Sequence, residues 1–221
     1  MERKSPAVKG RRPYDSSRRR QQARRSYGAV LEAARTLFLA SGYSATTLPA
    51  IAAAADVSVE TIHKAFGGKR GLVRAIWQQG LDGSGPIPAW RRSDEMRLVE
   101  PDPRAVIRNW GALTTDVAPR AAPILLLIRT AAATDPEMAA LHEEAESARL
   151  ERMEHNARHL YERGHLRKDV TLEEARDVLW TYSSPELYEL LVQRRGWALE
   201  RYGRFVAEGI IAAVLADADA G

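Results

Sequence analysis

The sequence predicts an all-α protein of about nine to ten helices, and three observations support that class. Apolar residues recur at helical spacing along most of the 221 residues. No segment shows the alternation of apolar and polar residues that is typical of a strand. Three dipeptides place a capping side chain directly before a proline, which is typical of the first turn of a helix: Asp102-Pro103, Asp135-Pro136 and Ser184-Pro185.

The composition is that of a globular protein. Hydrophobic residues make up 45% of the chain and charged residues 28%, which is enough for one compact or two small domains. The chain has no cysteine, so disulfides and thiolate chemistry are excluded. No uninterrupted apolar run approaches the roughly 20 residues of a membrane span, and no apolar stretch follows the basic N-terminus as in a secretory signal. We therefore expect a cytoplasmic protein.

Positive charge is concentrated at the N-terminus. Residues 1–25 contain ten Lys and Arg against Glu2 and Asp15, a net charge of +8, whereas the whole chain carries +4. This composition predicts a basic disordered arm. Three roles are open for it: non-specific contact with nucleic-acid phosphates, minor-groove contact through residues 9–13, which imperfectly match an AT-hook core, or a solvated tail.

Residues 46–69 predict two short helices around a tight turn. The first can begin at Thr46 or Thr47, because either hydroxyl can cap it, and Pro49 then falls in the first turn. Ser58 is a good N-cap for the second helix, which Gly67-Gly68 ends. Ile62 and Phe66 face inward, so the opposite face is available for a DNA major groove. The second helix is therefore predicted to be a recognition helix.

These residues, with neighbours on both sides, resemble the DNA-binding domain of the TetR family of bacterial one-component regulators. The resemblance covers about residues 26–80 and is carried by Ala34, Leu37-Phe38, Gly42-Tyr43, Thr46-Thr47, Ile51-Ala52, Val57-Ser58, Thr61-Ile62, Phe66, Lys69 and Leu72. Three positions depart from the family pattern. Glu60 stands where glycine is common, His63 where a phosphate-binding tyrosine is common, and Ala65 where a histidine often precedes the phenylalanine.

The resemblance implies a helix-turn-helix domain over residues 26–80 and a helical effector-binding and dimerisation domain over residues 81–221. We expect Thr47, Ser58 and His63 to contact phosphates, and Val59, Glu60 and Lys64 to approach base edges. Lys69 and the backbone N–H groups beside it could hold a further phosphate. The full set of expected DNA contacts is Thr46, Thr47, Ser58, Val59, Glu60, Thr61, His63, Lys64 and Lys69.

Flanking elements complete the predicted helical map. A framework helix is expected over about residues 26–40, and another helix from Lys69, followed by a partly flexible loop from Gly80 through Pro88. In the C-terminal part, helices are expected near residues 103–116, 119–133, 136–163, 172–182, 185–195 and 198–216. The helix from Pro136 carries two apolar stripes about a third of a turn apart, so we expect it to contact different neighbours along its length.

The last two long helices are candidates for a dimer interface. The final helix carries a wide apolar surface, including Tyr202, Phe205 and Ile210, and the helix at 172–182 adds Leu179 and Tyr182. Such surfaces suit a two-fold four-helix interface, which the resemblance also implies. A homodimer would present two recognition helices to a near-palindromic operator. The alternative is that both helices are intramolecular core.

The C-terminal domain is expected to bind an unknown small effector, apolar or amphipathic, in a cavity among its helices. The candidate lining residues are Trp77, Trp110, Thr114, Leu127 and Trp180, although each aromatic alone also fits ordinary core packing. Such an effector would release the protein from DNA, as in a repressor.

Sequence signals for catalysis are weak. Glu151, His155 and His159 share a helix face at zinc-ligand spacing, but the charged residues around them fit an ordinary solvated surface. No catalytic motif or phosphate-cradling glycine loop is present, so we expect neither an enzyme nor a cofactor or metal. Two alternatives to a regulator stay open: a basic-armed architectural DNA-binding protein without an effector, and a helical-bundle metalloenzyme.

Overall fold

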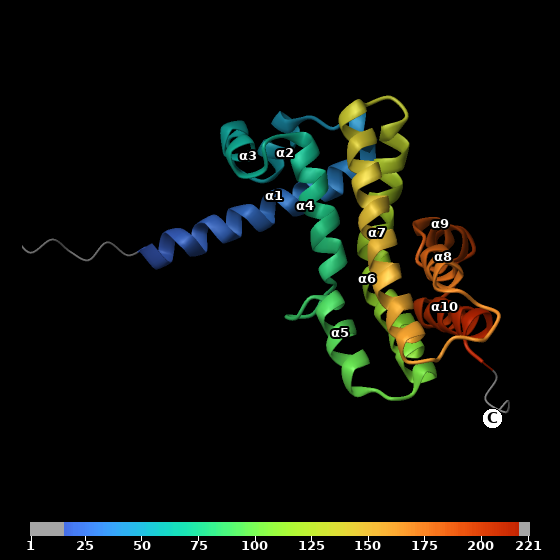
Figure 1. Ribbon diagram of the computed structural model, residues 1–221. Coiled ribbons are helices and arrows are strands. Elements are labelled where there is room, and N and C mark those ends of the chain that lie inside the picture. The colour runs from blue at the N-terminus through green and yellow to red at the C-terminus, as the bar shows by residue number, and fades with distance from the viewer. Residues whose placement is uncertain (1–15, 217–221) are drawn as a thin grey trace, which may run out of the picture.

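The computed structural model describes residues 16–216, which form a helical protein, as the sequence predicts (Figure 1). Within that range the only β pairing is an isolated bridge between Leu166 and Leu215. The elements are α1 Ser16–Ala45, α2 Leu48–Ala54, α3 Val59–Phe66, α4 Lys69–Asp82, α5 Ala89–Val99, α6 Pro103–Ala132, α7 Pro136–Glu162, α8 Leu172–Tyr182, α9 Pro185–Tyr188, the π-helix η1 Glu189–Arg194 and α10 Leu199–Val214.

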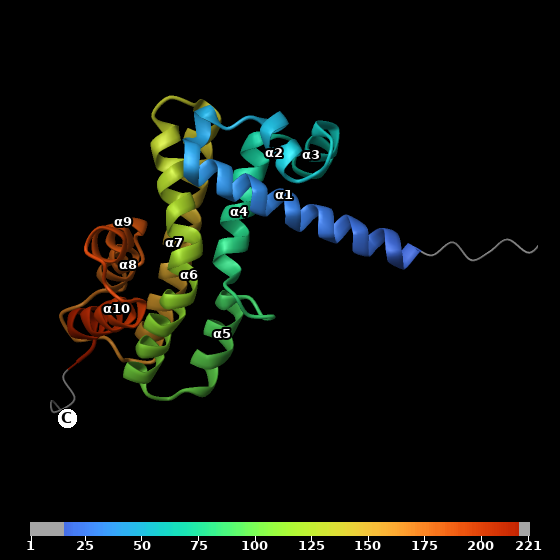
Figure 2. The ribbon, with the colours of Figure 1, turned by 180° about the vertical axis from the view of Figure 1, so that it is seen from behind.

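The long antiparallel hairpin of α6 and α7 is the centre of the molecule. Helices α4 and α5 run along one side of it and α8 to α10 pack on the other, as the two opposite views show (Figures 1 and 2). Helices α1, α2 and α3 form a head near the turn between α6 and α7. The head and the α8–α10 group therefore lie on opposite sides of one helical support.

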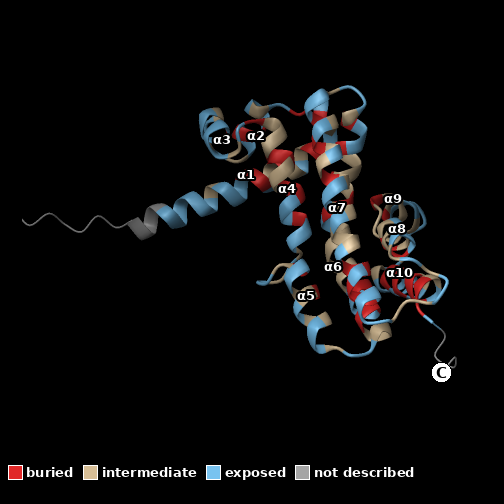
Figure 3. Ribbon diagram, in the orientation of Figure 1, coloured by how far each residue is buried: buried red, intermediate tan, exposed pale blue. Residues whose placement is uncertain are grey.

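Buried apolar side chains form two clusters (Figure 3). The first joins the head to the hairpin turn, because Phe38 of α1 and Ile62 of α3 share it with Ile124 of α6 and Leu141 of α7. The second lies between the other ends of α6 and α7 and helices α8 to α10. The head thus has a core continuous with the hairpin.

The two stripes of α7 belong to these two clusters, which confirms the prediction that this helix changes neighbours. Met138, Leu141 and Ala145 lie in the first cluster. Ala157 and Leu160 lie in the second. A phase shift of about a third of a turn between the stripes is what turns the apolar side of the helix from one group of neighbours to the other.

Helix α1 extends further toward the N-terminus than the sequence predicts. Residues 16–25 were expected to belong to the disordered arm, but they form the first turns of α1. Arginine, glutamine and alanine, which dominate this stretch, are strong helix formers, so a helix nucleated by the buried residues from Val30 onward can propagate backward through it. The rest of the arm, residues 1–15, lies outside the described residues.

Helix α6 runs through Pro119, where the sequence predicts a break. Pro123 has no N–H for the carbonyl of Pro119, but the guanidinium of Arg35 in α1 donates to that oxygen at 3.3 Å and to the Arg120 carbonyl at 2.8 Å. A partner distant in sequence therefore satisfies a carbonyl that a proline leaves open.

Two further segments differ from the prediction. The charged stretch after the loop forms α5, and the backbone N–H of Ser84 and the guanidinium of Arg92 both bond to Asp116 of α6, which ties the loop down. The helix expected over residues 185–195 is only four residues of α-helix, followed by η1.

One described helix, α6, is long and apolar enough to cross a membrane by length and composition alone, with a mean hydropathy of 1.3 over its best 18 residues. The helix contains no uninterrupted apolar run of that length, because charged residues such as Asp116 and Arg120 interrupt it. The helix packs against α1, α4, α7 and α10, as the core helix of a folded bundle does.

Candidate nucleic-acid interface and cavity

The turn between α2 and α3 is closed by local backbone hydrogen bonds. The N–H of Val57 donates to the carbonyl of Ala52 at 3.0 Å, and the N–H of Asp56 donates to Ala53 at 3.4 Å. This pairing requires a left-handed residue after the helix, and Asp56 supplies it with a φ of 53°. The chain can therefore end one helix and start the next within four residues.

Both short helices have the caps that the sequence predicts. The Thr47 hydroxyl accepts from the N–H of Ala50, and the Ser58 hydroxyl accepts from the N–H of Thr61 at 3.1 Å. Gly67 ends α3 in the left-handed conformation with a φ of 76°. The caps fix the direction in which α3 leaves the turn.

Helix α3 is held to the head by one side only. Ile62 is completely buried, and the ring of the half-buried Phe66 lies 4.6 Å from the ring of Tyr27 in α1. On its other sides the helix carries the exposed residues Ser58, Glu60, Thr61, His63 and Lys64. These five expected DNA contacts are therefore accessible together.

The remaining four expected contacts lie in different surroundings. Thr47 is exposed, whereas Val59 is half-buried against the head core. Thr46 is 3% exposed, and its hydroxyl donates to the carbonyls of Leu37 and Gly42. We therefore withdraw Thr46 as a DNA contact, because its only polar side-chain atom serves the joint between α1 and α2.

Lys69 lies at the start of α4, where its ammonium is 4.1 Å from the ring centroid of Tyr43 and 3.5 Å from the carbonyl oxygen of Ser44. Burial lowers the pKa of Lys69 and raises that of Tyr43 to about 12. The side chain is half-exposed. In this position it can secure α4 to the end of α1 and still reach a ligand in front of the head.

The N-terminal half of α1 projects past the head on the side where α2 and α3 lie (Figures 1 and 2). Its exposed residues include Arg20, Arg24 and Arg25. Positive charge therefore continues from the helix-turn-helix along α1, a distribution that favours contact with a polyanion.

A cavity of about 350 Å³ lies among α4, α5, α6, α7 and the α8–α10 group. Its walls are mostly apolar and aromatic, which is typical of small-molecule sites. Trp77 and Leu81 come from α4, Trp90 from α5, and Tyr188 and Tyr202 from the far side. From α7 the lining includes the polar residues Arg149, Arg152 and Asn156. Further polar lining residues are Ser93, Thr114, Ser183 and Ser184.

The structure places three of the five predicted lining residues at this cavity and two elsewhere. Trp77, Trp110 and Thr114 line it. Leu127 instead packs against the head cluster, and its neighbour Leu125 lines the cavity. Trp180 faces another part of the surface and holds the guanidinium of Arg149 against its ring at 4.3 Å.

Sequence reasoning missed the polar lining of the cavity. Asn156, Arg149 and Arg152 lie between the two apolar stripes of α7, so they resemble surface residues of that helix. Trp90, by contrast, was identifiable from the sequence as a tryptophan on a segment that could line a cavity, and it does line this one.

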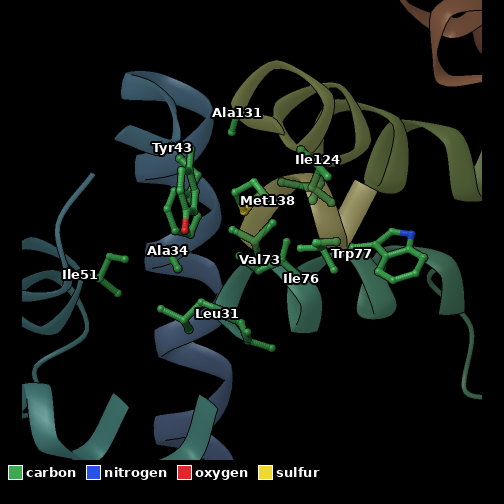
Figure 4. Close-up of a cluster of buried hydrophobic side chains, with 14 of the residues drawn as sticks. Leu31, Ala34, Tyr43, Ile51, Val73, Ile76, Trp77, Ile124, Ala131 and Met138 are labelled. Atoms are coloured by element: carbon green, nitrogen blue, oxygen red, sulfur yellow. The ribbon is translucent and has the colours of Figure 1, made fainter. Parts of the chain in front are cut away.

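The cavity and the head share helices. In α4, Val73 and Ile76 belong to the head cluster, whereas Trp77 lies at the end of that cluster away from Tyr43 and continues into the cavity (Figure 4). Against α6, α4 fits so closely that a Cβ on Gly80 would come within 3.1 Å of the Ala121 backbone. A displacement of α4 at the cavity therefore has to move part of the head core.

A family model described as bacterial regulatory proteins, tetR family, matches residues 30–76, the segment from the buried part of α1 to the middle of α4. Over this segment the chain is similar to the TetR family. A search of curated proteins found no relative.

Solved structures extend the likeness in fold over most of the chain. SmeT in complex with triclosan is 21% identical with a TM-score of 0.67, and 87% of this chain aligns with 93% of that one. NalD from Pseudomonas aeruginosa, the secondary repressor of the MexAB-OprM multidrug efflux pump, is 17% identical with a TM-score of 0.66, covering 88% and 99%. The fatty acid degradation regulator FadR from Bacillus halodurans is 16% identical with a TM-score of 0.68, covering 84% and 94%.

Within the segment that matches the family model, the three departures from the usual pattern are all exposed on α3: Glu60, His63 and Ala65. None of them supports the fold by burial. Their effect therefore falls on whatever this helix contacts, and we expect them to distinguish the base preference of this chain from that of its relatives.

Proposed function

We propose that this protein is a homodimeric, sequence-specific transcriptional repressor in the cytoplasm, and that a small apolar or amphipathic effector in the cavity releases it from a near-palindromic operator. The observation that carries the proposal is the connection between an exposed recognition helix and a cavity through α4 and α6. The match of residues 30–76 to a model of bacterial regulatory proteins supports it.

Helix α3 is the proposed reader of base edges. Glu60 and Lys64 lie one turn apart on its exposed side, within reach of one groove face, and Glu60 could accept a hydrogen bond from cytosine N4. Ser58, Thr61 and His63 add hydroxyl and imidazole groups that suit phosphates. The α1 extension would add sequence-independent affinity that falls with salt.

Effector control follows from the shared helices. A ligand that fits better when α4 is displaced from α6 stabilises that displaced state, and the head core moves with it. A difference in ligand affinity of a few kcal/mol between the two states is enough to change operator occupancy. Since α1 is hydrogen-bonded to the proline segment of α6, the head would respond to both helices.

The proposed dimer surface is the outer side of α8 and α10. Most of the apolar surface of α10, including Tyr202, Val206 and Ile210, is buried within the chain. Phe205 is 38% exposed, and its ring lies 5.9 Å from Tyr182 of α8 and 5.6 Å from Trp197. This aromatic group gives a two-fold contact an apolar centre. The apolar surface available for the interface is narrower than the sequence suggests, because most of that of α10 is buried within the chain.

The two alternatives have less support. The architectural reading leaves the cavity and its connection to the head without a role. The metalloenzyme reading needs free imidazoles, but Arg97 of α5 contacts His155 Nε2 at 2.5 Å and His159 Nδ1 at 3.2 Å. Over the described residues, no group of three or more His, Cys, Asp or Glu side chains could hold a metal ion.

Selection of bound sequences from random duplex DNA tests the proposed function. A sequence-specific regulator enriches a defined motif at physiological salt, whereas an architectural protein binds most sequences alike. Failure of the full chain to enrich any motif, together with even affinity for unrelated duplexes, would overturn the proposal in favour of the architectural alternative.

A further inference from the structure

Two buried polar atoms on uncharged side chains of the cavity lining have no hydrogen-bond partner among the described residues: Nε1 of Trp110 and Oδ1 of Asn156. Both residues line the cavity, and they are only 8% and 6% exposed. Buried polar groups in folded proteins are nearly always paired, so each of these atoms calls for a partner. One is a donor and the other is an acceptor.

The two atoms belong to facing helices at similar height. Trp110 lies 22 residues before the end of α6 at Ala132, and Asn156 lies 20 residues after the start of α7 at Pro136. With a rise of about 1.5 Å per residue, these positions are about 33 and 30 Å from the turn of the hairpin. Trp110 and Asn156 therefore lie at about the same height along the hairpin.

The charged side chains at the cavity are already paired. Among the described lining residues only Arg149 and Arg152 carry a charge. Arg149 bonds to Glu146 at 2.6 Å, and Arg152 bonds to Asp94 at 2.7 Å. The Nε of Arg149 also lacks a partner, but Glu146 balances the charge of its guanidinium.

These ion pairs work against a charged ligand. An anion would have to displace a carboxylate from an arginine, and a cation would face two arginines without a free carboxylate. A charge buried without a partner is strongly unfavourable. Trp110 and Asn156 instead offer a ligand a neutral donor and a neutral acceptor.

We infer that the effector is an uncharged, mainly apolar molecule with one hydroxyl group, which accepts a hydrogen bond from Trp110 Nε1 and donates one to Asn156 Oδ1. The inference rests on the proposed function, because it specifies the ligand class of the same cavity. A hydroxyl is the smallest group that both accepts and donates. Apolar walls from Trp77, Trp90 and Tyr202 surround the remainder of the ligand.

The size of the cavity guides the choice of probe. An apolar cavity of about 150 Å³ holds one benzene ring, so a cavity of about 350 Å³ suits a molecule roughly twice as large. We choose four probes on one bicyclic frame: 2-naphthol, naphthalene, 2-naphthoate and 2-naphthylmethylammonium. They differ in the hydroxyl group and in charge, while the apolar part is constant.

Calorimetric titration of the full chain at pH 7, without DNA, tests the inference. We expect 2-naphthol to bind at least about 10-fold more tightly than naphthalene, because naphthalene leaves both polar atoms unpaired. The two charged probes should be weaker than 2-naphthol by at least a similar factor. Equal or tighter binding of a charged probe, or no binding of any of the four, would overturn the inference.

Variants assign the preference to the named atoms. In Asn156→Leu, which keeps the shape but loses the amide, the ratio of naphthalene to 2-naphthol dissociation constants should fall toward one. Asn109→Leu is the matched control, since Asn109 is exposed on α6, and it should keep the wild-type ratio. If Asn156→Leu does not fold, Trp110→Phe tests the donor in the same way.

An unchanged ratio in the folded Asn156 or Trp110 variant contradicts the inference. The outcome is separable from that of the proposed function, because the titrations contain no DNA and the sequence selection contains no probe. A hydroxyl preference without an enriched DNA motif would leave the ligand class standing and remove the regulator. An enriched DNA motif without the hydroxyl preference would leave the regulator standing and remove the ligand class.

Discussion

Arg35 of α1 holds the carbonyl of Pro119 in α6, the oxygen that Pro123 leaves without a partner inside the helix. The same guanidinium donates to the carbonyl of Arg120 at 2.8 Å. One side chain of the DNA-binding head therefore closes an opening in the backbone of the helix that lines the cavity. This contact joins the two functional parts directly, in addition to the shared helix α4.

Replacing Arg35 by methionine should destabilise the protein. The variant keeps much of the apolar stem but leaves the Pro119 carbonyl without its charged donor, so we expect the free energy of unfolding in urea to fall by about 1–3 kcal/mol. Arg24→Met is the control, because Arg24 is exposed on the same helix, and it should change stability by less than about 0.5 kcal/mol. Equal stability of the two variants would show that Arg35 does not support α6.

The crossing of α6 and α10 depends on two glycines. A Cβ on Gly203 would lie 2.6 Å from the carbonyl oxygen of Gly111, closer than such atoms approach. We expect Gly203→Ala to lower the free energy of unfolding by about 1–3 kcal/mol, because the helices must separate. In Gly28→Ala the new Cβ meets no described atom within 4 Å, so the helix preference of alanine should stabilise that variant by up to about 1 kcal/mol.

The helix preference of alanine applies to both glycine variants. The difference between their changes in the free energy of unfolding therefore isolates the contact between α6 and α10. Chemical denaturation of the two variants beside wild type measures it. Similar stability changes of the same sign would mean that the helices are not in close contact at Gly111 and Gly203.

The bonds of Asp116 to the loop before α5 should make stability depend on pH. Burial acts to raise the pKa of Asp116, but hydrogen bonds from Arg92 and Ser84 outweigh it and lower the pKa from 3.8 to about 2. A carboxyl with a lowered pKa in the folded state stabilises the protein above the unfolded value and loses this effect as the pH falls toward the folded value. The affected range is therefore about pH 4 to 2.

We expect Asp116→Asn to be less stable than wild type at pH 7, with the difference shrinking as the pH falls from 4 toward 2. Urea denaturation at a series of pH values measures the difference. Asp82→Asn, at an exposed position at the end of α4, should differ little from wild type over the whole range. A difference for Asp116→Asn that stays constant below pH 4 is incompatible with the lowered pKa.

Glu60 should determine part of the DNA sequence preference. Since its side chain is exposed on α3, Glu60→Gly should change the motif selected from random DNA, with about 1 kcal/mol lost in helix stability. Glu143→Gly makes the same replacement at an exposed position on α7 and should retain the wild-type motif. A Glu60→Gly motif identical to that of wild type would exclude this residue from base recognition.

Features that depend on neighbouring residues were predictable from the sequence. The caps at Thr47 and Ser58 and the end of α3 at Gly67 involve residues within a few positions, and all of them are observed. The two stripes of α7 also led to a correct prediction, because periodicity reports directly on how the direction of burial changes along one helix.

Features that depend on distant partners were not predictable. The continuity of α6 through Pro119 requires Arg35, 84 residues earlier in the chain. In the run from Leu125 to Leu127 every residue is a plausible lining residue, and only the packing of α1 and α4 on α6 determines which of them reaches the cavity. Thr46 was misassigned because a hydroxyl beside a helix start can cap the helix, bind DNA or serve the joint behind it.

The central claim is that two copies of this chain read one symmetric site through α3. Sedimentation equilibrium of the full chain on its selected duplex, beside a duplex carrying one half-site, measures it most directly. The account predicts two chains on the palindromic duplex and binding to the single half-site weaker by at least about 100-fold, since the second contact is then lost. One chain on the palindromic duplex, or equal affinity for the half-site, would contradict it.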